Sequence, residues 1–212
     1  MKVEGLKDTI DWYDKNAGKY ADSAEKVPPI ELLEKFLSML PQSPQVLDAG
    51  CGSGRDSRFL HEKGALVTAI DISKGLLEEA EKRSEGITFV QGDITVMIFP
   101  DGSYDGVWSH ASLVHLETIE DVKKALREFG RVLKAGGILH IFVKAQTGDE
   151  KTAVVSDSLS NHDRFFRYYT EQELRELVTD AGFEDIDISL LPDPHGRTEV
   201  TWIALFARKK QI

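Results

Sequence analysis

The chain has 212 residues, 41% hydrophobic and 29% charged, which is enough for a substantial core and unlike a disordered segment. Its formal net charge of −10 disfavours a nucleic-acid partner, because phosphate recognition needs a basic face. A lone cysteine, Cys51, excludes an intrachain disulfide, and neither a secretory signal nor an apolar run of the ~20 residues needed to span a membrane is found. We therefore expect a cytoplasmic protein of one domain without membrane contact.

The first half of the chain begins with a segment to about Pro44 that we expect to be helical and to cover the site as a partial lid. It carries one apolar stripe, made of Ile30, Leu33, Leu37 and Leu40. Strand and helix signals then alternate. We expect a strand at Val46–Leu47, a helix over Arg55–Lys63, a strand over Ala65–Ile70, a helix capped by Ser73, and strands over Ile87–Val90 and Tyr104–Trp108.

The second half of the chain carries two helix starts with the spacing of capping boxes, Thr118 with Asp121 and Thr170 with Glu173. The first of these helices is expected to end at Gly136–Gly137 and the second at Gly182. Three more strands are expected, over Ile138–Val143, Phe183–Leu190 and Val200–Ala207. No helix separates the last two, so they predict an antiparallel hairpin.

Strands that alternate with helices predict a mainly parallel sheet covered on both faces, because parallel strands need crossover connections. The expected fold is therefore an α/β, Rossmann-like three-layer sandwich. Its seven-stranded sheet would be mostly parallel, with one antiparallel strand contributed at its end by the carboxyl-terminal hairpin. Ligands of such sheets bind beyond the carboxyl ends of the strands, where the chain's first glycine-rich loop lies.

That glycine-rich loop follows the first strand in the segment VLDAGCGSGRD. Its alternating glycines, which allow a sharp turn and close backbone approach to a ligand, are Gly50, Gly52 and Gly54. The dinucleotide fingerprint would need glycine or alanine at Arg55, and the phosphate-loop lysine is absent. Asp48 would repel a pyrophosphate but suits a ligand with an ammonium or sulfonium group. A nicotinamide-dependent oxidoreductase is thus disfavoured.

The segment VLDAGCGSGRD resembles the first motif of class I S-adenosylmethionine (SAM)-dependent methyltransferases, of the methyltransferase domain 11 or 25 type. Asp71 follows the loop at about 20 residues, the spacing of a ribose-binding acid. Gly92-Asp93-Ile94 is similar to the family's adenine-contacting turn. SYDGVWSHASLVHL resembles its fourth-strand motif, and REFGRVLKAGGILHI resembles its helix, glycine turn and fifth strand. The resemblance covers roughly Tyr13 to the end of the chain.

The resemblance implies an enzyme that uses SAM, releases S-adenosylhomocysteine (SAH), and methylates a small-molecule acceptor at oxygen or nitrogen. The cofactor contacts it implies are Tyr20, Asp48, Gly50, Cys51, Gly52, Gly54, Arg55, Asp71, Ile72, Gly92, Asp93, Ile94 and Ser109. Within one domain over residues 1–212, we expect a helical cap at 1–44 and a SAM-binding core at 45–145. Residues 146–212 would then form the acceptor-side helix and the terminal hairpin.

Candidate catalytic residues are His110 and His115, which lie just past the fourth strand, because a hydroxyl or ammonium acceptor must lose a proton. A packing role is the alternative for either histidine. Candidate acceptor contacts are Tyr13, Lys144, Arg164, Tyr168, Arg197 and Trp202, and the cations among them would bind an acidic group. The aromatic and cationic segment from Asn161 to Tyr169 could line this pocket, or could be a loop that packs its rings on the core.

Two other functions stay open. Residues Phe166 to Phe183 distantly resemble wobble-uridine tRNA methyltransferases, and a SAM-binding protein without catalysis would share the same fold. Ser109-His110-Ala111-Ser112 stands where enzymes that methylate adenine or glutamine nitrogen carry an Asn-Pro-Pro-Tyr type motif, which disfavours those acceptors. No metal is expected, since neither His-x-x-x-His nor paired cysteines occur. We expect a monomer or a homodimer.

Overall fold

The computed structural model describes residues 6–157 and 162–211. Its helices are α1 (Leu6–Ala24), α2 (Ile30–Ser38), α3 (Arg55–Glu62), α4 (Lys74–Arg83), the 3₁₀ turn η1 (Leu113–His115), α5 (Ile119–Val132) and α6 (Glu171–Asp180). Its strands are β1 (Gln45–Ala49), β2 (Leu66–Asp71), β3 (Thr88–Gln91), β4 (Tyr104–His110), β5 (Leu133–Lys144), β6 (Thr152–Asp157), β7 (His162–Arg167), β8 (Phe183–Pro192) and β9 (Thr201–Lys209). In the described part of the chain, no helix is long and apolar enough to cross a membrane.

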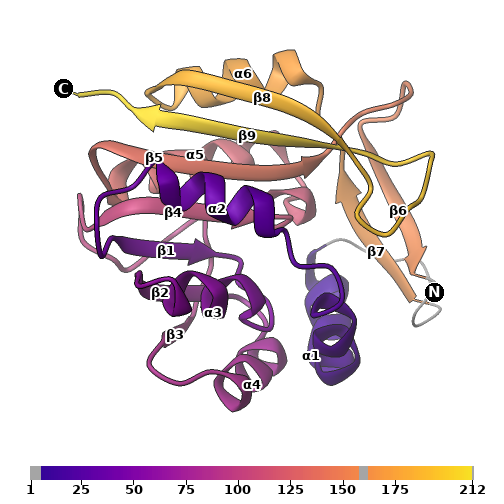
Figure 1. Ribbon diagram of the computed structural model, residues 1–212. Coiled ribbons are helices and arrows are strands. Elements are labelled where there is room, and N and C mark those ends of the chain that lie inside the picture. Colours follow the sequence, from indigo (N-terminus) through magenta and orange to yellow (C-terminus); the bar gives the residue numbers. More distant parts are fainter. Residues whose placement is uncertain (1–5, 158–161, 212) are drawn as a thin grey trace.

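The main sheet has seven strands in the order β3-β2-β1-β4-β5-β9-β8 (Figure 1). Neighbouring strands from β3 to β5 pair in parallel, whereas β9 is antiparallel to both β5 and β8. The expected Rossmann-like fold is confirmed. One detail differs from the prediction. The antiparallel strand β9 is the second strand from the end of the sheet, and β8 is the edge strand.

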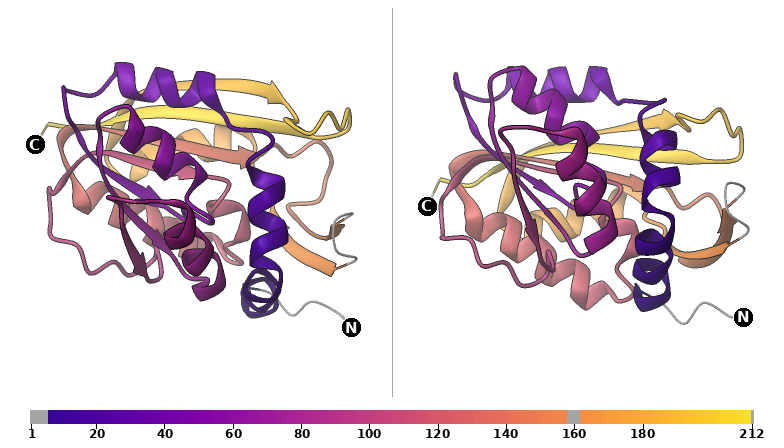
Figure 2. Two further views of the ribbon diagram at one scale, coloured as in Figure 1. Left: turned by 60° about the horizontal axis from the view of Figure 1, so that its bottom comes forward. Right: turned by 90° about the horizontal axis from the view of Figure 1, so that it is seen from below.

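Helices cover both faces of this sheet, with α5 and α6 on one side and α2 and α3 on the other (Figure 2). Phe129 of α5 belongs to the larger apolar cluster, whereas Phe36 of α2 packs in a second cluster with Trp108. Because Leu33 and Phe36 are fully buried on the sheet, α2 does not cover the site. Of the lid expected over residues 1–44, the described residues that line the site pocket all belong to α1.

The predicted helix starts are confirmed by side-chain caps. Ser73, Thr118 and Thr170 each accept a hydrogen bond from the amide three residues later, at 3.1–3.2 Å. The expected end of α5 at Gly136–Gly137 is wrong, since the helix ends at Val132 and both glycines lie inside β5. A Cβ on Gly137 would lie 3.1 Å from the Asp105 carbonyl oxygen, so glycine serves close strand contact here, at an irregular stretch of the β4–β5 pairing.

The aromatic and cationic segment before α6 is a strand, not a loop. Residues 162–167 form β7, which pairs antiparallel with β6 in a separate two-stranded sheet. Asn161 lies outside the described residues. Phe166 and Tyr169 belong to the larger apolar cluster, so the rings of this segment do pack on the core. The sheet of β6 and β7 lies beside α1, which brings it to the rim of the site (Figure 1).

Candidate active site

A pocket of about 730 Å³, counting its open mouth, lies beneath α1 at the carboxyl ends of the central parallel strands. It is lined by Leu6, Thr9, Ile10, Tyr13, Tyr20, Gly50, Gly52, Asp71, Ile72, Ser73, Leu76, Gly92, Asp93, Ile94, His110, Ala111, Ser112, His115 and Leu116. This is the position where open α/β sheets bind their ligands.

The glycine-rich loop forms the floor of this pocket through Gly50 and Gly52. Gly50 has φ of +84°, and a Cβ there would lie only 2.3 Å from the Cβ of Ser112. Its amide donates to the Ile70 carbonyl at 2.8 Å, which closes the turn after β1. Both the backbone conformation and the lack of space therefore require glycine at this position.

Asp71 ends β2 and presents a carboxylate that two backbone amides hold in place. Gly52 donates to Oδ2 at 2.8 Å and Ser73 donates to Oδ1 at 2.9 Å. Burial raises the pKa of Asp71, while these hydrogen bonds act in the opposite direction. Each carboxylate oxygen keeps a lone pair, so the pair can accept two hydroxyl groups from one ligand.

Asp48 lies beneath the loop and does not line the pocket. Its side chain is buried and accepts a hydrogen bond of 2.5 Å from Ser57 Oγ on α3. Burial, followed by the negative charge of Asp56, raises the pKa of Asp48 to about 8. Asp48 is thus mainly protonated at neutral pH, and its predicted contact with the cofactor stays a prediction.

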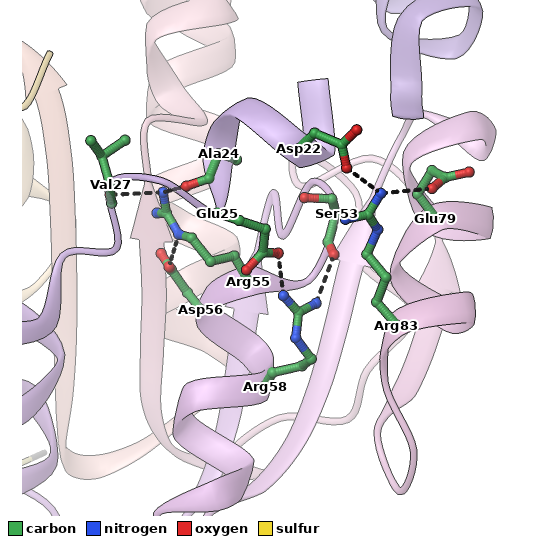
Figure 3. Close-up of polar contacts among 10 residues, drawn as sticks. All are labelled: Asp22, Ala24, Glu25, Val27, Ser53, Arg55, Asp56, Arg58, Glu79 and Arg83. Atoms are coloured by element: carbon green, nitrogen blue, oxygen red, sulfur yellow. Dashed lines mark hydrogen bonds and ion pairs between the residues drawn. The ribbon is translucent and has the colours of Figure 1, made fainter. Parts of the chain in front are cut away.

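Arg55 also lies outside the pocket lining. Together with Arg58 and Arg83 it forms a cluster that holds the end of α1 (Figure 3). Arg55 donates to the carbonyl oxygens of Ala24 and Val27, both at 3.1 Å. Within the same cluster, Arg58 pairs with Glu25 and Arg83 pairs with Asp22. The geometry gives Arg55 a structural part, and its predicted cofactor contact stays a prediction.

Tyr13 and His115 meet inside the pocket, where Tyr13 Oη lies 3.1 Å from His115 Nε2. The other ring nitrogen, Nδ1, lies 2.8 Å from the Phe165 carbonyl oxygen, which can only accept, so Nδ1 carries the proton. Nε2 therefore accepts from Tyr13, and Tyr13 in turn accepts from Arg164 Nη1 at 2.8 Å. Burial, and next the Arg164 charge, lowers the pKa of His115 to about 3 and keeps the ring neutral at pH 7.

His110 lines the pocket with its ring held between neighbours. It stacks on Phe142 at 4.2 Å and 6°, and on Trp108 at 5.4 Å and 2°. Its Nδ1 lies 3.5 Å from Nε2 of the fully buried His140. Burial lowers the pKa of His110 to about 4. Both candidate bases thus border the pocket as neutral imidazoles.

Among the predicted acceptor contacts, only Tyr13 lines the pocket, and Arg164 reaches it through the Tyr13 hydroxyl. Lys144 Nζ lies 3.5 Å from the centroid of the Phe166 ring. The remaining three residues predicted for the acceptor, which also lie outside the lining, are Tyr168, Arg197 and Trp202. The last two share Asp193, whose carboxylate accepts from Arg197 at 2.7 Å and from Trp202 Nε1 at 2.9 Å. Joint binding of an acidic group by Lys144, Arg164 and Arg197 stays a prediction.

The predicted cofactor residues divide into two groups. Those that line the pocket are Tyr20, Gly50, Gly52, Asp71, Ile72, Gly92, Asp93 and Ile94. Those that lie outside its lining are Asp48, Cys51, Gly54, Arg55 and Ser109. The sequence analysis missed lining residues from α1, from the amino-terminal end of α4 and from the segment after β4, namely Leu6, Thr9, Ile10, Ser73, Leu76, Ala111, Ser112 and Leu116. Only Ser73, predicted as a helix cap beside Asp71, carried a usable signal.

Comparison with known proteins gives concordant matches. The family described as "Methyltransferase domain" matches residues 47–141. A protein of Encephalitozoon cuniculi (strain GB-M1) that is named as a methyltransferase is 31% identical over 211 residues, which cover 93% of each chain.

Two further matches name substrates. The malonyl-[acyl-carrier protein] O-methyltransferase of Enterobacter lignolyticus (strain SCF1) is 37% identical over 45% of this chain, which spans only 37% of that enzyme. The structure of the 1,6-didemethyltoxoflavin-N1-methyltransferase of Burkholderia thailandensis, with bound 1,6-didemethyltoxoflavin and SAH, superimposes with a TM-score of 0.74. It is 25% identical and covers 97% of this chain and 87% of its own.

Proposed function

Because the chain belongs to the class I SAM-dependent methyltransferases, we propose that it transfers the methyl group of SAM to oxygen or nitrogen of a small-molecule acceptor. The observation that carries this proposal is the pocket beneath α1, whose lining includes Asp71, Tyr13 and His115. We assign the part around Asp71 to the cofactor and the part around Tyr13 and His115 to the acceptor, and call them the cofactor half and the acceptor half. Similar proteins are named for transfer to oxygen and to nitrogen, so both acceptor atoms belong to the proposal.

The chemistry of the residues around Asp71 supports SAM as the ligand of the cofactor half. The Asp71 carboxylate, fixed by two backbone amides, can accept from both ribose hydroxyls. Asp93 and Ile94 would border the adenine on the same side of the pocket. The amino-acid end would lie against Gly50 and Gly52, which line the pocket without side chains.

The acceptor half supplies hydrogen-bonding groups that can position a hydroxyl or amine acceptor. Bound SAM supplies an electrophilic methyl group, and the electron pair of the breaking bond stays on sulfur. Tyr13 Oη donates to the neutral His115 Nε2 and accepts from Arg164, and its second lone pair can accept from the O–H or N–H of the acceptor. The proton that the acceptor loses would pass to solvent, because the lowered pKa makes His115 a poor base. Correct positioning of the two reactants would supply most of the rate enhancement.

The size and charge of the site favour a small molecule over tRNA. Leu6 and Ile10 of α1 line the pocket together with Leu116, so part of its wall is apolar. A net charge of −10 also opposes phosphate binding. Tight, salt-dependent binding of tRNA would reverse this preference.

The test is a screen of hydroxyl, carboxyl and amine acceptors with methyl-labelled SAM, followed by mass analysis of the products. For the acceptor that is found, we expect Tyr13→Phe to lower kcat on the order of 10²-fold, because the acceptor loses the hydroxyl that positions it. Tyr104→Phe, a matched change outside the pocket lining, should keep full activity. Labelled product that Tyr13→Phe forms as fast as wild type would refute the positioning role of Tyr13, and SAH binding without any transfer would favour a non-catalytic protein.

A further inference from the structure

Asp14, the neighbour of Tyr13 on α1, contacts the amino-terminal end of α4. Its Oδ1 accepts from Ser73 Oγ at 2.6 Å and from the Gly75 amide at 2.9 Å. A Cβ on Gly75 would lie 2.7 Å from the Asp14 carbonyl oxygen, so the two helices touch here backbone to backbone. A carboxylate at a helix amino terminus is stabilised by the free amides and the helix dipole.

Ser73 connects Asp14 to the cofactor half of the pocket. Its amide donates to Asp71 Oδ1 at 2.9 Å, while its hydroxyl donates to Asp14. The same hydroxyl accepts from the Leu76 amide as the cap of α4. Ser73 thus donates hydrogen bonds to two carboxylates, that of Asp71, which we propose binds the ribose, and that of Asp14 on α1.

Tyr13 connects the same stretch of α1 to the acceptor half, through its hydrogen bond to His115. Consecutive helix residues point about 100° apart, so Asp14 reaches the start of α4 while Tyr13 reaches into the pocket. The first part of α1 therefore bridges the two halves of the site by two neighbouring side chains.

A break in α1 separates this bridge from the rest of the helix. Asn16 has φ of −118° and ψ of 15°, which are not helical values. After the break, residues 17–24 lead into the segment held by the cluster of Arg55, Arg58 and Arg83 (Figure 3). Before the break, residues 6–15 supply four of the lining positions. Most of the lining that α1 supplies thus lies before the break, in residues 6–15, and Tyr20 lies after it.

We propose that Asp14 is a positioning residue, which fastens residues 6–15 to the cofactor half so that a bound cofactor holds Tyr13 against His115. The proposal rests on the proposed function, since it assigns the cofactor to the Asp71 side. A ligand that contacts the closed lid stabilises the closed state by linkage, and Asp14 supplies a bond that exists only in that state. The acceptor half is then completed after the cofactor has bound.

The experiment measures amide hydrogen exchange of the whole protein with and without saturating SAH, and calorimetry establishes SAH binding for each variant. In wild type, SAH should slow exchange in residues 6–15. In Asp14→Ala, exchange of these residues in the SAH complex should be about fivefold faster, the factor that a loss of ~1 kcal/mol produces. Asp14→Asn keeps the acceptor oxygen and should restore most of the protection. Asp11→Ala, an exposed change on the same helix, should behave as wild type.

The internal control is the segment of residues 17–24, which should exchange equally in all variants. Equal protection of residues 6–15 in Asp14→Ala and Asp11→Ala would overturn the role of Asp14 and leave the proposed function intact. Faster exchange that spreads to residues 17–24 would also overturn it, as a general loss of helix packing. Absence of SAH binding to wild type would instead refute the cofactor assignment, and this proposal with it.

Discussion

Gly50 offers a quantitative test of the pocket floor. The substitution Gly50→Ala adds one methyl group at a position with φ of +84°. That methyl group would lie 2.3 Å from the Cβ of Ser112, an atom fixed to the backbone, so the loop after β1 or the turn after β4 must shift. Both segments line the pocket.

The loss of folding free energy that we expect for Gly50→Ala has two parts. A left-handed backbone conformation costs an alanine about 1–2 kcal/mol. Overpacking against Ser112 adds about 1–3 kcal/mol. The sum, about 2–5 kcal/mol, is a large share of the ~5–15 kcal/mol that stabilises an ordinary domain. Gly64→Ala isolates the first part, because Gly64 has φ of +93° and nothing within 4 Å of an added Cβ.

Urea denaturation of Gly50→Ala, Gly64→Ala, Ser112→Gly and the Gly50→Ala/Ser112→Gly double variant would separate the two parts. We expect the double variant to be more stable than the sum of its single changes, because the clash is absent. The Ser112 hydroxyl bonds to Ser109 at 2.6 Å, and the single Ser112 variant accounts for that loss. A Gly50→Ala cost no larger than that of Gly64→Ala, or strict additivity in the double variant, would refute the packing of the loop against Ser112.

Three further predictions concern buried titratable side chains. Since the pKa of His115 is lowered from 6.5 to about 3, the unfolded chain takes up a proton that the folded chain does not, and stability falls as pH falls from 6.5. Its share is about 2 kcal/mol at pH 5, and denaturation of His115→Asn should show a loss between pH 7 and 5 smaller by that amount. The pKa of Asp48 is raised from 3.8 to about 8, so its contribution to stability is fully present below pH 4 and is lost as pH rises to 8. Over that pH range, the urea concentration at the midpoint of denaturation should fall less for Asp48→Asn than for wild type. Asp193→Ala leaves Trp202 Nε1 buried without its acceptor and should lower the free energy of unfolding, measured in denaturant, by about 2–4 kcal/mol. Asp193→Asn keeps an acceptor oxygen and should lose less, so an equal loss in the two variants would contradict this reason.

Local signals in the sequence predicted the fold well. Helix caps such as Thr118 and Thr170 act over three residues, and the amide contacts confirm both. The glycine-rich loop has its place after β1 for the same reason, because its conformation is set within a few residues. Gly136 and Gly137 misled the prediction of the α5 end, since a glycine pair fits an irregular strand as well as a helix stop.

The acceptor half of the site was less predictable, because long-range packing sets it. Tyr13 and His115 lie 102 residues apart, and only the fold brings them within hydrogen-bonding distance. For Asp48 too, packing sets a feature that the sequence did not predict, although its partner is near in the sequence. Its position before the loop was predicted, but not that its side chain would turn beneath the loop to Ser57 on α3. The direction of a side chain at a strand end depends on the helix that packs there.

The assignment of the pocket to SAM is tested most directly by calorimetric titration of SAH into wild type and Asp71→Ala. We expect one SAH to bind per wild-type chain and the variant to bind it roughly 10- to 100-fold more weakly, because hydrogen bonds to a charged group are lost. NADH should give no binding heat with either protein. Absence of SAH binding to wild type, or equal affinity in the two proteins, would contradict the assignment.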